Sequence, residues 1–188
     1  YPDSRVARRL TCHDGVLRSS WIDSRPAAFH PVGGMHLIHA TCISLDDQGV
    51  LLLGPSGAGK SDLALRLIDG GAVLVADDQV CCRRDGEMLY ASAPMALAGV
   101  IEVRGLGSVS IDYLPCVPLR LAFDLMTPDC IERVPLTTAY RLQGVELPLV
   151  PLAPFEASAP AKVTLACRMV VRGEVPLTNL ASARAERS

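Results

Sequence analysis

The chain has 188 residues, 49% hydrophobic and 20% charged, a composition typical of one globular domain with a sizeable core. Its formal net charge of −2 at pH 7 lacks the basic excess expected of a nucleic-acid-binding protein. No apolar run approaches the length of a membrane span, and the first residues do not resemble a signal peptide. We therefore expect a protein that works in the cytoplasm.

Seven cysteines occur without a Cys-x-x-Cys spacing, and several lie in apolar stretches, where a free thiol behaves as a small hydrophobic side chain. They are Cys12, Cys42, Cys81, Cys82, Cys116, Cys130 and Cys167. We expect reduced cysteines and no disulfide framework. A zinc site built from His36, His39 and Cys42 is an alternative that we disfavour, because no second pair of ligands accompanies them.

Residues 1–34 differ from the rest of the chain because they are rich in Arg, Ser and Pro and show no sustained periodicity. We predict a disordered leader there, with Met35 as a candidate natural start, or alternatively an arm that packs on a partner. The catalytic domain is expected over residues 35–175, and residues 176–188 are expected to form a flexible tail.

Short apolar runs separated by turn residues dominate from residue 36 onward. They predict strands at 36–45, 50–53, 72–76, 80–84, 87–91, 101–103, 108–113 and 117–125, with loops and one possible strand at 144–150 thereafter. Apolar spacing predicts helices at 61–69, ended by Gly70 and Gly71, and at 158–171, with Pro160 in the first turn. The expected fold class is α/β, a mixed central sheet with few helices that contains a phosphate-binding loop.

The loop in question spans residues 54–61, which read Gly-Pro-Ser-Gly-Ala-Gly-Lys-Ser and match the pattern G-x-x-x-x-G-K-[ST]. Glycines let backbone N–H groups turn toward an anion, and the following helix adds its partial positive charge. The lysine of this pattern reaches the outer phosphates, and the hydroxyl coordinates magnesium. The residues predicted to bind the cofactor are Gly54, Pro55, Ser56, Gly57, Ala58, Gly59, Lys60 and Ser61.

Lysine usage supports the same site independently of the pattern. The chain contains 18 Lys and Arg residues together, but lysine occurs only at positions 60 and 162. A sequence that avoids lysine this strongly has still kept one at the phosphate position, where the bulkier, forked arginine fits poorly.

An acidic pair, Asp77 and Asp78, ends the strand after the predicted helix. In a βαβ unit we expect this strand to lie beside the one before the loop, so that both strand ends point toward the phosphates. Magnesium nucleotides need carboxylate and hydroxyl oxygens, so one acid of the pair can orient the metal through water and the other can take a proton from an attacking hydroxyl. Asp77 is included among the predicted metal ligands. The alternative is a solvated turn without chemistry.

The order and spacing of these residues resemble the HPr kinase/phosphorylase family. The resemblance rests on His39 before the loop, Lys60 within it, Val75-Ala76-Asp77-Asp78 after it, and the signature Glu-Val-Arg-Gly-Leu-Gly at residues 102–107. It covers most of residues 36–172 and nothing of residues 1–34. It implies the HPr kinase and PEP carboxykinase-like type of catalytic domain.

The resemblance further implies that a phosphoryl group passes from ATP to a serine of the phosphocarrier HPr, and that the same site can remove it by phosphorolysis. Ser61 and Glu102 would bind Mg²⁺, and Asp78 would accept the serine proton. His39 would lie near the reacting phosphate, while Lys60 would offset its charge. A homo-oligomer, a hexamer in the family, is the implied assembly.

Arginines of the second half are harder to assign. Arg133 is the best match to a catalytic arginine of the family, although a surface salt bridge is nearly as good an explanation and Arg141 is a rival. Arg104 lies inside the signature, where it would either bind a phosphate or pair with Glu102.

The chain also departs from the family pattern. The basic loop that phosphorolysis requires corresponds to residues 150–160, which contain no arginine. Together with the short region before Met35, this resembles the short form described in alphaproteobacteria, and it weakens the expectation of the reverse activity. Two alternatives stay open: an ATP-sensing regulatory module of a phosphotransferase system with little catalysis, and a small-metabolite kinase.

Overall fold

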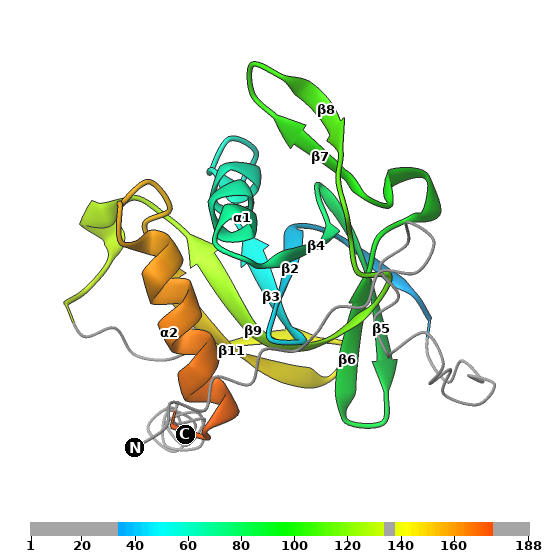
Figure 1. Ribbon diagram of the computed structural model, residues 1–188. Coiled ribbons are helices and arrows are strands. Elements are labelled where there is room, and N and C mark those ends of the chain that lie inside the picture. Colours follow the sequence, from blue (N-terminus) through cyan, green and yellow to red (C-terminus); the bar gives the residue numbers. More distant parts are fainter. Residues whose placement is uncertain (1–33, 134–137, 175–188) are drawn as a thin grey trace, which may run out of the picture. The chain divides into compact units, whose positions relative to one another are not determined.

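The computed structural model describes residues 34–133 and 138–174 (Figure 1), so the predicted leader and tail lie almost entirely outside the described residues. The strands are β1 (His36–His39), β2 (Thr41–Leu45), β3 (Gln48–Leu53), β4 (Val73–Ala76), β5 (Gln79–Asp85), β6 (Met88–Ser92), β7 (Val100–Val103), β8 (Gly107–Ser110), β9 (Val117–Leu125), β10 (Thr138–Leu142) and β11 (Val145–Leu152). The α-helices are α1 (Lys60–Asp69) and α2 (Ala159–Val171), and short 3-10 turns occur at Met95–Leu97 and Pro128–Cys130. A mixed sheet with few helices, the predicted fold class, is confirmed.

Nine of the described strands form one mixed sheet. Seven of them follow the order β1-β5-β6-β9-β3-β2-β4, and β11 and then β10 extend the sheet from β9. The long strand β9 runs parallel to both β3 and β11 and antiparallel to β6. Strands β7 and β8 form a separate antiparallel hairpin, which stands away from the sheet in Figure 1.

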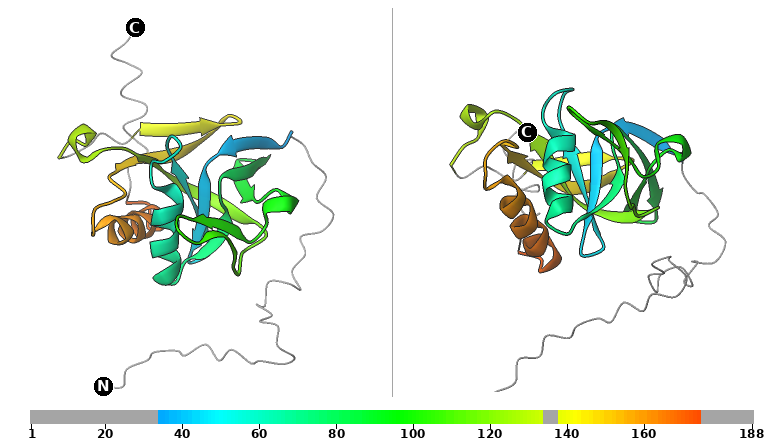
Figure 2. Two further views of the ribbon diagram at one scale, coloured as in Figure 1. Left: turned by 90° about the horizontal axis from the view of Figure 1, so that it is seen from above. Right: turned by 45° about the horizontal axis from the view of Figure 1, so that its top comes forward.

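Each face of the central strands carries its own hydrophobic core. Alternate side chains such as Ile43, Val50 and Phe123 pack with α1 and α2, whereas Cys42, Leu51 and Ala122 pack with residues of β5, β6, β10 and β11. This alternation follows from the two-residue period of a strand. Both helices therefore lie on one face of these strands, as two further views show (Figure 2).

Helix α1 begins directly after the phosphate-binding loop and buries Leu63, Ala64 and Leu67 against the sheet. Its spacing of apolar residues is the one predicted, and the backbone N–H of Gly70 donates to the carbonyl of Arg66 at the C-terminal end. No helix in the described part of the chain is long and apolar enough to cross a membrane.

Three details differ from the sequence-based expectations. The predicted strand 36–45 is divided at Ala40, because β1 pairs with β5 whereas β2 pairs with β3 and β4. Strand β4 does not lie beside β3, since β2 is inserted between them. Strands β3 and β4 are both antiparallel to β2, so they still run in the same direction and their carboxyl ends meet at the same edge. Strand β10 lies in a stretch expected to be loop.

Candidate active site

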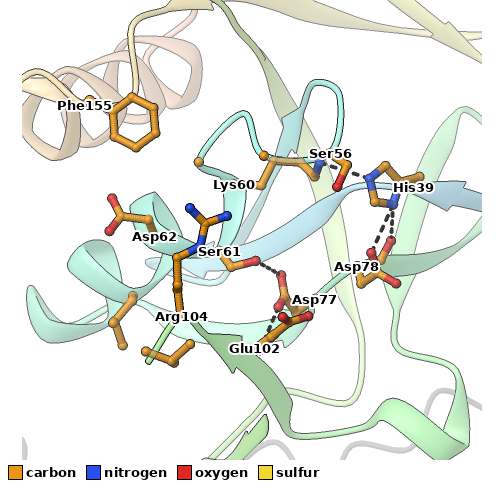
Figure 3. A pocket seen from close by; sticks show the side chains of 14 residues that line it. His39, Ser56, Lys60, Ser61, Asp62, Asp77, Asp78, Glu102, Arg104 and Phe155 are labelled. Carbon is orange, nitrogen blue, oxygen red and sulfur yellow. Dashed lines mark hydrogen bonds and ion pairs between the residues drawn. The ribbon is translucent and has the colours of Figure 1, made fainter. Parts of the chain in front are cut away.

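A cavity of about 440 Å³ lies where the carboxyl ends of β3 and β4 meet the N-terminus of α1. The phosphate-binding loop forms one wall, and the β7–β8 hairpin contributes another (Figure 3). The lining residues with polar or aromatic side chains are His39, Ser56, Lys60, Ser61, Asp62, Asp77, Asp78, Glu102, Arg104 and Phe155. The structure thus brings together the predicted site residues from four separate segments of the chain.

The phosphate-binding loop adopts left-handed backbone conformations that favour glycine. Gly57 has φ 80° and Gly59 has φ 90°, values that most L-residues avoid. At Gly59 a Cβ would also approach the Cζ atom of Phe155 to 2.8 Å. Glycine is therefore required there both by backbone conformation and by the close ring.

Lys60 is the first residue of α1, and only 7% of it is exposed. Its Nζ donates to the carbonyl oxygens of Gly54 and Pro55, both at 2.9 Å, and lies 3.1 Å from Nε2 of His39. Burial lowers the pKa of Lys60 below its ordinary value of 10.5, and Asp78 and Asp77 oppose this shift. The ammonium group is thus held in place by the loop it would serve.

His39 connects this lysine to the second acid of the pair. Its Nδ1 lies 3.0 Å from the backbone carbonyl and 3.1 Å from a carboxylate oxygen of Asp78. Because the ammonium group of Lys60 can only donate, Nε2 of His39 accepts, and Nδ1–H then donates to the Asp78 oxygens. The three residues form a chain of hydrogen bonds along one side of the cavity.

Asp78 has an unusual backbone for a non-glycine residue, with φ 64°. The N–H of Gln79 donates to the carbonyl of Asp77 at 2.7 Å, which closes a tight turn around Asp78. Aspartate tolerates the left-handed region better than most residues, and such conformations gather at functional sites. The turn aims the Asp78 carboxylate at His39 rather than back along the strand.

Asp77 has a different environment, because it is only 4% exposed and accepts three hydrogen bonds. The hydroxyl groups of Thr41 and Ser61 donate to its Oδ1 at 2.6 and 2.9 Å, and the backbone N–H of Glu102 donates to Oδ2 at 3.0 Å. The adjacent acids therefore separate into a buried, fully bonded carboxylate and an exposed one.

Oxygen ligands for a magnesium ion are available beside the loop. Ser61 donates its proton to Asp77, so the lone pairs of its hydroxyl are free to face a cation. Glu102 adds a second carboxylate at the cavity wall. The described residues contain no group of three His, Cys, Asp or Glu side chains suited to a metal. Magnesium uses few protein ligands in nucleotide sites, where water and phosphate oxygens complete its shell.

The sequence left open which of three arginines belongs to the site. Arg104 lines the cavity, whereas Arg133 is exposed and is not among the lining residues. Arg141 forms an ion pair with Glu146 at 2.5 Å on the β10–β11 hairpin. Of these arginines, Arg104 is therefore the one that the structure places beside the phosphate-binding loop.

Sequence reasoning missed two residues of the site. Thr41 looked like one of several small residues in a strand, and its bond to Asp77 depends on β2 lying beside β4. Phe155 comes from the loop before α2, in the stretch expected to correspond to a basic loop. The chain is poor in aromatic residues and has only three phenylalanines, and this rarity was the available signal that Phe155 has a specific place.

Comparison with known proteins agrees with this geometry. Residues 33–114 match the model of the HPr serine kinase C-terminal domain. The matched part of the chain is thus similar to an HPr serine kinase C-terminal domain. The match contains the phosphate-binding loop, the acidic pair and the signature around Glu102. The resemblance predicted from the sequence is confirmed.

The chain is also similar to curated proteins and to a solved structure. It is 42% identical over 74 residues to the HPr kinase/phosphorylase of Mycoplasmopsis pulmonis, which covers 39% of this chain and 24% of that protein. It is 38% identical over 106 residues to the HPr kinase/phosphorylase of Listeria monocytogenes. This match covers 56% of this chain and 32% of the Listeria protein. The Hpr(Ser) kinase/phosphatase from Coxiella burnetii superposes with a TM-score of 0.62 at 25% identity, covering 73% of this chain and 95% of that chain.

These matches cover different shares of the proteins compared. The matched segments span about a quarter to a third of the length of the curated relatives. The solved structure, in contrast, is matched over most of its length.

Proposed function

We propose that this protein transfers the terminal phosphoryl group of ATP to a serine hydroxyl of an HPr-type phosphocarrier protein, with magnesium as the metal. The relatives are named for HPr kinase activity, and the site contains the groups that this reaction needs. The regulatory ATP-sensing module of a phosphotransferase system is the alternative.

One observation carries the proposal: the hydrogen-bonded row Lys60–His39–Asp78 at the cavity wall. It places a cation for the transferring phosphoryl group beside an exposed carboxylate that can take a proton. A protein that only binds nucleotide needs the lysine but not a carboxylate held in this way. The left-handed backbone at Asp78 also supports a catalytic role for this residue, because such strained conformations gather at functional sites.

In the proposed reaction, the serine oxygen attacks the γ-phosphorus, and the bond from that phosphorus to the bridging oxygen of ADP breaks. The serine proton passes to the carboxylate of Asp78, which His39 orients through Nδ1–H. Lys60, whose ammonium is held at the loop by the carbonyls of Gly54 and Pro55, neutralises charge on the moving phosphoryl group. Magnesium, when bound, neutralises the β- and γ-phosphates, and Ser61, Asp77 and Glu102 would hold it.

The reverse reaction receives less support from this chain. Phosphorolysis needs cations for inorganic phosphate, but residues 150–160 supply none. The nearby Lys162 pairs with Glu156, and Arg66 pairs with Asp62 at 2.9 Å. Among the described arginines, Arg104 lines the cavity, so we propose net kinase activity with phosphorolysis that is weak rather than absent.

The test is incubation of the purified protein with magnesium-ATP and the HPr-type carrier of the same organism, followed by mass spectrometry of the carrier. Lys60→Ala should abolish the phosphoserine. Arg172→Ala is the control, because it removes an exposed cation at the end of α2 that is not among the residues lining the cavity. ATP binding without any phosphoserine would overturn the kinase proposal and favour the regulatory module.

We also propose a homo-oligomer, a hexamer by family resemblance, acting in the cytoplasm. The support is the family resemblance alone. Light scattering of the purified chain would test the assembly, and a monomer at micromolar concentration would contradict it.

A further inference from the structure

A second cavity, of about 670 Å³, opens on the other side of the phosphate-binding loop. It shares three residues with the first cavity, namely Ser56, Gly57 and Phe155. The remaining lining residues are Pro55, Ala58, Leu125, Met126, Thr127, Pro128, Ala153, Pro154 and Glu156. The two cavities therefore meet at the loop and at the ring of Phe155.

The walls of the second cavity suit a flat apolar group rather than an anion. Its lining is mainly aliphatic, proline and aromatic side chains, and among the described residues that line it only Glu156 carries a charge. The carboxylate of Glu156 is engaged by Lys162. A phosphate would find no cation among these lining residues, whereas a heterocyclic ring would bury apolar surface.

Phe155 is the residue that stands between the two cavities. The tip of its ring contacts Gly59, yet 70% of the residue is exposed. A large aromatic side chain left this exposed beside a ligand cavity has surface available for stacking.

The loop that carries Phe155 is tied to α1 by Arg66. Its Nη2 donates to the carbonyl of Pro154, and its Nη1 donates to the carbonyl of Glu156 at 3.5 Å. These two carbonyls flank Phe155 in the chain. The ring is therefore exposed but not loosely attached, which lowers the entropy cost of stacking a ligand on it.

The position of Phe155 also agrees with the direction in which a nucleotide is expected to lie in the first cavity. Figure 3 shows Phe155 at one end of the first cavity and His39 with Asp78 at the other, with Lys60 and Ser61 between them. A triphosphate whose terminal phosphate faces Asp78 has its ribose and base directed away from Asp78, toward Phe155.

We infer that the second cavity is the nucleobase subsite and that the base of ATP stacks on Phe155. The inference rests on the proposed function, because it assumes that the phosphate-binding loop holds a nucleotide. It goes further by assigning the base to the stretch that was expected to carry a basic loop. Recognition by stacking tolerates different bases, so ATP and GTP should bind with similar affinity.

The test compares the binding of ATP, ADP and inorganic tripolyphosphate by calorimetry in the presence of magnesium. Phe155→Ala should weaken ATP and ADP about 5- to 150-fold, the range for loss of one base–aromatic stack, and leave tripolyphosphate unchanged. Phe155→Trp should retain the affinity for ATP. Leu165→Ala removes an exposed apolar side chain of α2 that lines neither cavity, and it should change nothing.

A variant that fills the cavity provides a second, independent measurement. Met126→Trp places a large side chain in the lining, and it should weaken ATP by at least about tenfold while sparing tripolyphosphate. Wild-type affinity for ATP in both Phe155→Ala and Met126→Trp would overturn the base subsite but leave the proposed kinase intact. Failure of the wild-type protein to bind ATP at all would overturn both.

Discussion

The hydroxyl of Thr41 lies 2.6 Å from Oδ1 of Asp77, and both residues are buried. This bond links β2 to the carboxyl end of β4, and Ser61 donates to the same oxygen. The orientation of the buried acid is therefore set jointly by the sheet and by the phosphate-binding loop. Its remaining oxygen is fixed by the backbone of the β7–β8 hairpin.

Thr41→Val should destabilise the protein by about 1–3 kcal/mol, because it leaves a buried carboxylate oxygen with one donor fewer. Thr41→Ser retains the hydroxyl and is the control. Urea unfolding measures the change, and the magnesium concentration for half-maximal activity should rise in the valine variant. Equal stability of the valine and serine variants would show that the bond contributes nothing net.

Asp78→Asn should lower turnover about 10²- to 10⁴-fold, the usual contribution of a general base, while ATP affinity stays nearly intact. Asparagine is well suited to the left-handed backbone at this position and can still accept from His39, so the turn should survive. Turnover and calorimetric affinity are measured on the same preparation. A fall in ATP affinity as large as the fall in turnover would assign Asp78 to magnesium binding instead.

The affinity for triphosphate should fall as the pH rises. The fall should begin at a lower pH than it would if Lys60 had the pKa of an ordinary lysine. Burial lowers the pKa of Lys60 below 10.5 in the free protein, so its charge is lost earlier. Over the same range the unfolded chain holds more protons, so this lysine makes the free protein more stable as pH rises. Binding of tripolyphosphate across pH 7–10.5, compared with Lys60→Ala, measures the effect, and a parallel decline in both proteins would contradict it.

Gly59→Ala should weaken ATP binding and destabilise the protein by about 1–2 kcal/mol, because φ is 90° there and the new Cβ would meet Phe155. The double variant Gly59→Ala/Phe155→Ala separates the two causes. Removing the ring should recover only part of the stability, since the backbone strain stays. Full recovery in thermal unfolding would mean that contact with the ring was the whole effect.

Local patterns in the sequence were sufficient for the parts of the site that are continuous in the chain. The strand, loop and helix around Lys60 and the hairpin β5–β6 follow from apolar spacing and glycine positions within a dozen residues. The burial of Asp77 and the exposure of Asp78 were not anticipated, and their separate roles stay a prediction.

Contacts between distant segments could not be derived in this way. The insertion of β2 between β3 and β4 is a choice of strand order that a local pattern does not encode. Phe155 meets Gly59 only because the loop before α2 folds back over α1. Arg133 was chosen by family resemblance, and its exposure outside the cavity gives that role no support from the structure.

Ala40 separates β1 from β2, which pair with different strands of the sheet, and one residue on each side of it reaches the site. His39 contacts Lys60 and Asp78 on one side, and Thr41 contacts Asp77 on the other. Ala40, which is fully buried, is the one residue between the contacts of His39 and those of Thr41. We expect a larger side chain at position 40 to disturb both sets of contacts together.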